Sequence, residues 1–200
     1  MSANTHQHCL LEAALYAAFP REPLPSMEWE KRDSFGYEIQ HSFKGKRWPE
    51  AIGLRLTYGE LDPSLNTWAY CLPAEVMRYF LPSHLMMASL RLKFGDRSDY
   101  CSNVMEALLL PTDDPVADAV RDAAMSGCFA LDAYPDRGMA LYRMLSAPQR
   151  ACVAAYLDLY AAYHGAAEMN AQVRALYDAN RDVWRDSSLI EPGADVQVEN

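Results

Sequence analysis

Apolar residues recur at helical spacing along most of the chain. Pro20 ends the first of these runs, which predicts a helix over residues 5–19 from Leu10, Leu11, Ala14, Leu15, Ala18 and Phe19. From Leu72 onward, runs with the same period alternate with short breaks. They predict further helices over residues 73–80, 83–94, 99–110, 114–126, 137–145, 147–164 and 167–185.

This pattern predicts a mainly α fold. Because the breaks between the runs are short, residues 1–185 are expected to form a single multi-helix domain. Residues 186–200 hold four acidic residues, no basic ones and little periodicity. We therefore expect an acidic, loosely ordered tail after the last helix.

Prolines, a glycine and capping residues set the predicted helix boundaries. Pro82 is expected to separate helices 73–80 and 83–94, with Ser83 as the N-cap of the second. Ser146 and Gln149 have the spacing of a capping box, which predicts the start of helix 147–164. Gly165 is expected to end that helix.

Residues 26–70 are the least regular part of the chain and are rich in aromatic residues. They include three of the four tryptophans, Trp29, Trp48 and Trp68. Within them, apolar and other residues alternate over 52–58, which is consistent with a short strand or hairpin and, almost as well, with a helical turn. We expect this segment to pack against the helices.

The cysteines and the N-terminus indicate a cytoplasmic protein. The first 15 residues lack the plan of a secretory signal, and no run of 18 apolar residues predicts a membrane span. The five cysteines are scattered and none forms a C-x-x-C pair. This pattern is typical of free thiols in a reducing compartment, each expected to be a small buried residue.

Motifs that carry chemistry are absent from the sequence. It has no H-E-x-x-H, no phosphate-binding glycine loop and no G-x-S-x-G. His6 and His8 lie in an N-terminus expected to fray, while His84 and His164 are expected to have structural roles. The pattern predicts no catalytic residue, metal site or cofactor, although a Cys–His dyad assembled from distant positions stays open.

Net charge narrows the choice of partner. The chain carries 27 acidic and 18 basic residues, a formal charge of −9, and residues 101–200 hold 15 of the acids but only 7 of the bases. Nucleic acid and anionic membrane surfaces both require surplus lysine and arginine. The sequence therefore argues against either as the partner and leaves proteins and small molecules.

Two series of aspartates have helical spacing. Asp114, Asp118 and Asp122 fall on one helix face, and Asp113 adds to the same end. This face is interpreted as a solvated surface, as a docking surface for a basic partner, or as carboxylates paired for metal or acid–base chemistry. On the last helix, arginines alternate with the second series, Asp178, Asp182 and Asp186, which predicts local ion pairs.

Two longer segments and a short motif resemble a known group of proteins. They are LPAEVMRYFLPSHLMMASL at 72–90, LSAPQRACVAAYL at 145–157, and the upstream sequence Trp48-Pro-Glu. Together they resemble an uncharacterised bacterial family in which a Tyr-(Phe/Tyr)-Leu-Pro helix pair precedes a Leu-Ser-x-x-Gln helix. The resemblance covers residues 45–165, and its motifs are structural, so it transfers no functional residue. Some small acidic proteins of this sort resemble immunity partners of secreted bacterial toxins.

These features favour a non-enzymatic binding protein. The most concrete form is a bacterial immunity protein that neutralises a basic toxin domain through an acidic and aromatic surface. The residues expected to bind the partner are Asp113, Asp114, Asp118, Asp122, Trp29 and Trp48. The alternatives are a small-molecule-binding protein or enzyme, with a pocket between the helices and residues 26–70, and an assembly subunit.

Overall fold

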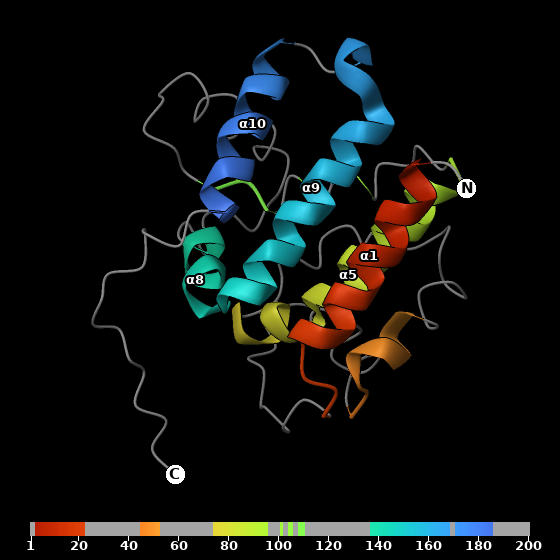
Figure 1. The fold of residues 1–200 in the computed structure, drawn as a ribbon. Coiled ribbons are helices and arrows are strands. Elements are labelled where there is room, and N and C mark those ends of the chain that lie inside the picture. The colour runs from red at the N-terminus through yellow and green to blue at the C-terminus, as the bar shows by residue number, and fades with distance from the viewer. Residues whose placement is uncertain are drawn as a thin grey trace, which may run out of the picture.

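Figure 1 shows a computed structural model of the chain, in which the described residues form a framework of helices. The structure describes residues 3–22, 45–52, 74–95, 101, 104–105, 108–110, 137–168 and 171–185. The helices are α1 (Ala3–Ala18), α5 (Ala74–Lys93), α8 (Arg137–Met144), α9 (Ala147–Glu168) and α10 (Ala171–Arg185), and residues 48–52 form one short further helix. No strand occurs among these residues, so the predicted mainly α fold is confirmed.

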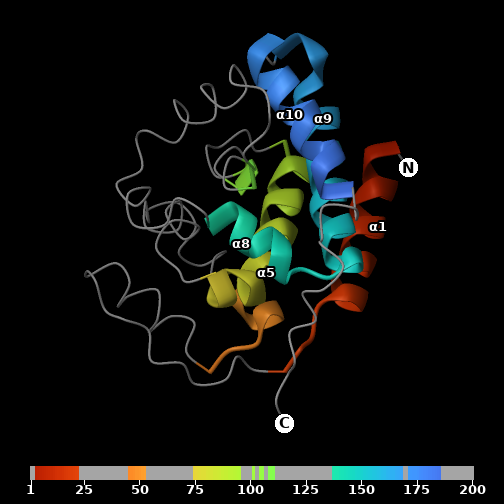
Figure 2. The ribbon, with the colours of Figure 1, turned by 90° about the vertical axis from the view of Figure 1, so that its left-hand side faces the viewer.

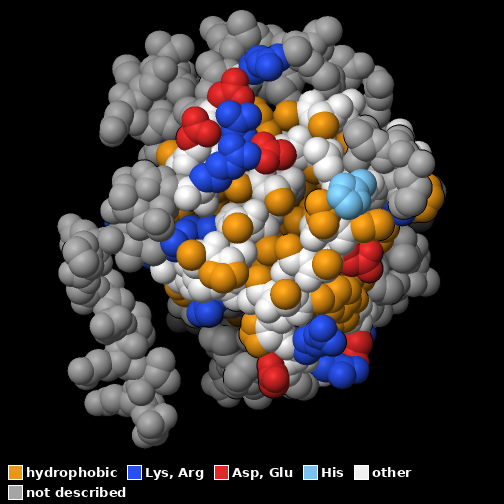
Figure 3. Space-filling model, viewed as in Figure 1, with side chains coloured by type: hydrophobic (Ala, Val, Ile, Leu, Met, Phe, Trp, Pro, Cys, Tyr) orange, Lys and Arg blue, Asp and Glu red, His pale blue; other side chains and the backbone are white. Residues whose placement is uncertain are grey.

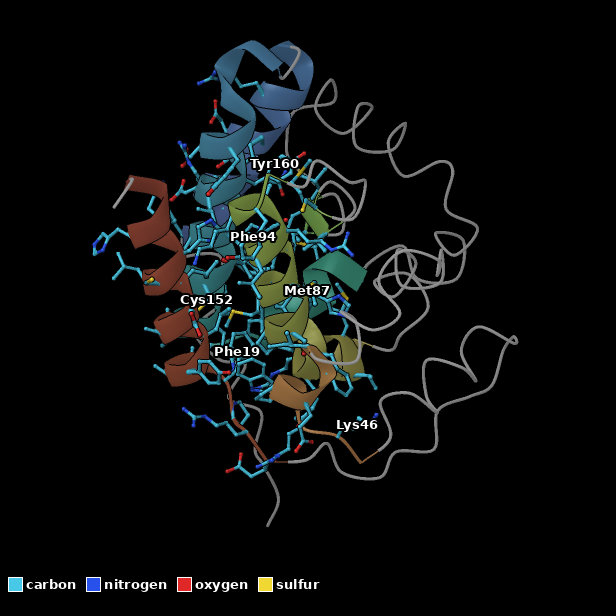
Figure 4. All side chains as sticks on the ribbon, turned by 90° about the vertical axis from the view of Figure 1, so that its right-hand side faces the viewer. Phe19, Lys46, Met87, Phe94, Cys152 and Tyr160 are labelled. Atoms are coloured by element: carbon cyan, nitrogen blue, oxygen red, sulfur yellow. The ribbon has the colours of Figure 1, made fainter. Side chains whose placement is uncertain are left out.

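Helix α9 lies at the centre of the framework. It packs against α1, α5 and α10, while α5 also contacts α1 and α8. Helices α9 and α10 run antiparallel, so that the end of α10 lies toward the beginning of α9 and next to α8 (Figures 1 and 2). Figure 4 shows side chains in the space between α1, α5 and α9, with Cys152 of α9 among them, while Met87 lies on the side of α5 toward α8.

Helix α1 confirms the first predicted helix. Its apolar positions Leu11 and Leu15, together with Phe19 just beyond its end, are buried in the core. Their spacing places them on the side that faces α5 and α9. The backbone N–H of Phe19 still bonds to the carbonyl of Leu15, and Pro20 then lies outside the helix.

Helix α5 corrects the predicted break at Pro82. The chain forms one helix from Ala74 to Lys93 with Pro82 inside it, and Ser83 is no N-cap, because its hydroxyl donates to the carbonyl of Trp48 at 2.8 Å. A proline inside a helix costs about 3 kcal/mol. All residues from 80 to 89 are buried, and each large apolar side chain among them returns about 1.5–3 kcal/mol. Burial therefore outweighs the local cost.

Helix α9 confirms one predicted boundary and corrects the other. The Gln149 side chain accepts a hydrogen bond from the backbone N–H of Ser146 at 3.1 Å, as expected for a capping box. The predicted end at Gly165 is wrong, because the helix continues to Glu168. Among the described glycines, only Gly45 and Gly95 have the positive φ typical of a glycine helix cap. Helix α8 matches the predicted 137–145 closely.

The remaining described residues test the predicted helix at 99–110 and the start of the predicted strand. Cys101, Val104 and Met105 are helical, but Leu108–Leu110 are not, so helix 99–110 ends earlier than predicted. The Asn180 side chain bonds both backbone groups of Leu110, and the indole of Trp184 donates to the carbonyl of Leu108 at 2.8 Å. Ile52 is helical, so the predicted strand does not begin there; residues 53–58 and 114–126 lie outside the described part.

Helices long and apolar enough to cross a membrane are absent from the described ranges.

Candidate functional site

The residues predicted to bind a partner fall into two groups. Asp113, Asp114, Asp118, Asp122 and Trp29 lie outside the residues that the structure describes, so their predicted role stays a prediction. Trp48, in contrast, is described, and it does not fit the expectation of an exposed aromatic anchor. Its side chain is fully buried, and its ring lies 5.0 Å from that of Tyr16 on α1.

A local pattern explains why Trp48 is buried. Trp48, Ala51 and Ile52 have the i, i+3, i+4 spacing of one helix face, and the first two are fully buried. Glu50 bonds the backbone N–H and the guanidinium of Arg47, both at 2.9 Å, which stabilises the start of this short helix. Trp48 therefore anchors residues 48–52 to α1 and α5.

Charge is divided unevenly between the described residues and the rest of the chain. The described residues hold 12 basic and 8 acidic side chains, whereas the remaining residues hold 6 basic and 19 acidic ones. The acidic surplus therefore lies entirely outside the described helices. Residues 96–136 alone contain nine acids and two bases, and residues 186–200 contain four acids and no bases.

Two aspartates of the second predicted series, Asp178 and Asp182, form local ion pairs on α10 as expected, while the third, Asp186, lies outside the described residues. Asp178 lies 3.8 Å from Arg174 and 3.5 Å from Arg181. Asp182 lies 3.5 Å from Arg181 and 3.9 Å from Arg185. Figure 3 shows the acidic and basic side chains next to one another over this helix. Because these groups are well exposed, each pair adds little stability.

His8 forms a buried polar cluster that corrects the expectation of a frayed N-terminus. Its Nδ1 lies 2.7 Å from the hydroxyl of Ser89 on α5, and its Nε2 lies 2.9 Å from the hydroxyl of Tyr163 on α9. The imidazole is 4% exposed. Burial, reinforced by the positive charge of Lys93, lowers the pKa of His8, so the ring is held neutral.

The His8 cluster is structural rather than nucleophilic. A histidine beside a serine hydroxyl is the arrangement that activates a nucleophile. Ser89 is, however, only 3% exposed, so a substrate carbon has no approach to its oxygen. The cluster therefore joins α1, α5 and α9 through side chains whose hydrogen bonds are satisfied. The sequence does carry a signal for it, since His8, Leu11 and Leu15 share one helix face.

A groove of about 240 Å³ lies between α9 and the end of α10. Alanines of α9 line it together with the ring of Trp184, and Arg150, Asp158 and Arg185 contribute the charged groups. Asp158 pairs with Arg185 and lies 3.9 Å from Arg181. The groove thus combines an apolar floor with one paired carboxylate and the guanidinium of Arg150.

Arg150 is a buried cation without a carboxylate partner among the described residues. Its side chain is 3% exposed, its Nη1 donates to the carbonyl of Leu145 at 2.7 Å, and its guanidinium carbon lies 5.1 Å from the centre of the Tyr142 ring. No described residue accepts from its other nitrogens. Within the described part, Trp48 Nε1 is the only fully buried side-chain nitrogen or oxygen without a hydrogen-bond partner. The unpaired Arg150 nitrogens are therefore not fully buried and keep some contact with solvent.

Metal and thiol chemistry receive no support from the described residues. They contain no group of three or more His, Cys, Asp or Glu side chains placed to hold a metal ion. Cys101 and Cys152 are buried, as expected, but Cys9 is exposed, which corrects the expectation for that position. Burial raises the pKa of Cys152 to about 11, so its thiol stays protonated and unreactive.

Comparison of the chain with models of known families, with curated proteins and with solved structures finds no match. The resemblance over residues 45–165 therefore stays a prediction, and arguments about function must come from the chain itself.

Proposed function

We propose that this protein is a non-enzymatic binding protein whose acidic segments recognise a basic protein, in the manner of an immunity protein that neutralises a secreted bacterial toxin. The observation that supports this most directly is the division of charge. The described helices carry more bases than acids, while the other residues hold 19 acids and 6 bases.

Charge divided in this way suits recognition of a basic partner. Acidic side chains dispersed over a whole surface would mainly keep the protein soluble, whereas acids gathered in particular segments produce a local field. Such a field speeds encounter with a basic protein and disfavours acidic ones. Residues 96–136, which include the aspartate series, form the most acidic long segment and are the proposed docking region.

The burial of potentially reactive side chains in the described part also fits a binding role better than catalysis. The one serine–histidine contact is closed to substrate, and the buried Cys152 thiol is protonated. The alternative of a ligand-binding protein draws on a single feature, the groove beside Arg150. That groove lies between α9 and α10. The pocket expected between the helices and residues 26–70 stays a prediction, because most of those residues lie outside the described part.

The test compares two variants with equal loss of charge. Asp114→Asn with Asp118→Asn removes two charges from the proposed docking face, and Asp178→Asn with Asp182→Asn removes two from ion pairs on α10. The ligand is the protein encoded by the neighbouring gene, and surface plasmon resonance at several salt concentrations gives the association rate. We expect the first variant to slow association about tenfold at low salt and the second to change it far less.

Two results would contradict the proposal. Equal slowing in both variants would show that only net charge matters and that the aspartate face is no docking surface. Absence of any binding to the neighbouring gene product would remove the immunity function itself.

A further inference from the structure

The guanidinium of Arg150 has one donor edge that the described residues leave unused. Its Nη1 donates to the carbonyl of Leu145 at 2.7 Å, and the ring of Tyr142 lies against its plane, 5.1 Å from the guanidinium carbon. The Nε and Nη2 atoms, which share another edge of the plane, have no hydrogen-bond partner among the described residues. Two parallel N–H groups on one edge are the arrangement that a carboxylate binds through both of its oxygens.

This donor edge faces the groove between α9 and α10. Arg150 is only 3% exposed, yet its unpaired nitrogens are not fully buried, so its small solvent-accessible area includes the Nε–Nη2 edge. Arg150 is also one of the residues that line the groove. A buried guanidinium whose spare donors reach a groove is a binding group for an anion, because an uncompensated charge removed from water costs several kcal/mol.

Neighbouring aromatic residues hold the guanidinium in place. The ring of Tyr142, on which it rests, lies 5.2 Å from the ring of Trp184. The indole of Trp184 in turn donates to the carbonyl of Leu108 at 2.8 Å. The start of α9, the end of α10 and helix α8 therefore meet around this side chain (Figures 1 and 2). A donor edge that is fixed in this way loses little freedom when a ligand binds.

The charges around the groove favour a single negative charge in its occupant. Asp158, the carboxylate that lines the groove, is already paired with Arg185 and lies 3.9 Å from Arg181. Arg150 thus supplies the one positive charge at the groove without an acidic partner among the described residues. One carboxylate would neutralise this charge, whereas a phosphate monoester carries about −1.5 to −2 and would leave a surplus.

The size and lining of the groove indicate what accompanies that carboxylate. Four alanines of α9 and the ring of Trp184 form its apolar part. Its volume is about 240 Å³, whereas an apolar cavity of about 150 Å³ is enough to hold benzene. The groove therefore has room for one aromatic ring beside a carboxylate, and burial of that ring against the alanines is favourable.

We propose that the groove between α9 and the end of α10 is a binding site for a small monocarboxylate whose apolar body has about the size of one aromatic ring. The carboxylate accepts hydrogen bonds from Nε and Nη2 of Arg150, and the apolar body lies on the alanines beside Trp184. This site goes beyond the proposed recognition of a basic protein and does not depend on it.

The test titrates the full chain with phenylacetate and follows it by nuclear magnetic resonance. The Nε–H of Arg150 and the backbone amides of Ala151 and Ala154 report binding at the groove. We expect saturable shifts with a Kd on the order of 1 mM. Phenylacetamide, which has the same shape but no charge, and phenyl phosphate should each bind at least about tenfold more weakly.

Two variants test the donor edge and the apolar floor separately. Arg150→Met removes the guanidinium and should weaken phenylacetate binding at least about tenfold, with Arg143→Met on α8 as a matched control that leaves it unchanged. Ala151→Leu keeps Arg150 but fills the groove from an exposed position, and it should weaken binding at least about fivefold. Its control is Ala162→Leu, an exposed position of α9 outside the groove.

Three results would overturn the proposal. The first is the absence of a saturable shift up to about 50 mM phenylacetate. The second is equal or tighter binding of phenylacetamide or phenyl phosphate, because either would show that the site does not select a carboxylate. The third is an affinity for phenylacetate that is the same in Arg150→Met or Ala151→Leu as in the matched control.

Discussion

Two buried polar side chains of this molecule differ in how completely the fold satisfies them. His8 is enclosed by α1, α5 and α9, and both of its ring nitrogens have a hydroxyl partner within 2.9 Å. Arg150 is as deeply buried at the start of α9, but the described residues give it one hydrogen bond and an aromatic ring. Burial alone therefore does not show whether the fold satisfies all the hydrogen-bonding groups of a polar side chain.

The difference lies in what the fold supplies around each side chain. A neutral imidazole needs one donor and one acceptor, and two hydroxyls provide both for either tautomer. A guanidinium has five N–H donors and a positive charge. The apolar, alanine-rich surface around Arg150 offers hydrogen-bond acceptors for only some of these donors. The first site is complete within the framework, whereas the described residues leave the second without an acidic partner.

The largest effect that tests this comparison is expected from His8→Ala. The change leaves the buried hydroxyl of Ser89 without its partner, removes a bond to Tyr163 and opens a cavity between three helices. We expect a loss of about 3 kcal/mol in the free energy of unfolding, measured by urea denaturation. His6→Ala serves as the control, because His6 is exposed on the same helix, and should change stability by less than about 0.5 kcal/mol. Equal effects would show that the cluster contributes nothing particular.

A smaller effect is expected from pH. Burial and Lys93 lower the pKa of His8 in the folded protein below 6.5, so the unfolded chain binds the proton more readily. The stability that neutral His8 contributes is therefore fully present well above pH 6.5 and is lost as the pH falls through that value toward the folded-state pKa, by at most about 1.4 kcal/mol per pH unit. Urea denaturation of the native chain and of His8→Gln across this range measures the contribution. If the two stabilities ran parallel, His8 would not be the titrating group.

Local sequence rules predicted the helices well where local and tertiary preferences agree. The capping box of Ser146 and Gln149 set the start of α9 correctly, because both partners lie within four residues of each other. The helix ends expected at Pro82 and Gly165 were wrong, because there the local preference and the tertiary structure disagree. A proline or a glycine raises the free energy of a helix only locally. At Pro82, the free energy gained by burying the surrounding residues exceeds that cost, and the helix continues.

The candidate sites were harder to predict because their parts are distant in sequence. His8 has the position of a core residue on α1, but its partners lie 81 and 155 residues away, and no local pattern encodes them. From the sequence, Arg150 is indistinguishable from an ordinary surface residue of α9. In the fold, Tyr142 of α8 lies against its guanidinium. The aspartate face is a purely local pattern, so the sequence predicts it readily, while its role depends on a partner.

The smallest effect on stability is expected from Arg150→Met, although Arg150 is as deeply buried as His8. Methionine keeps much of the apolar stem against Tyr142, and it removes a charge that the described helices leave without an acidic partner. Replacing a poorly compensated buried charge with an apolar side chain is often close to neutral. We therefore expect urea denaturation to show a loss of at most about 1 kcal/mol, against almost none for Arg143→Met at an exposed position of α8. A loss as large as that of His8→Ala would contradict the comparison, because it would mean that the framework depends on the Arg150 charge as strongly as on the His8 cluster.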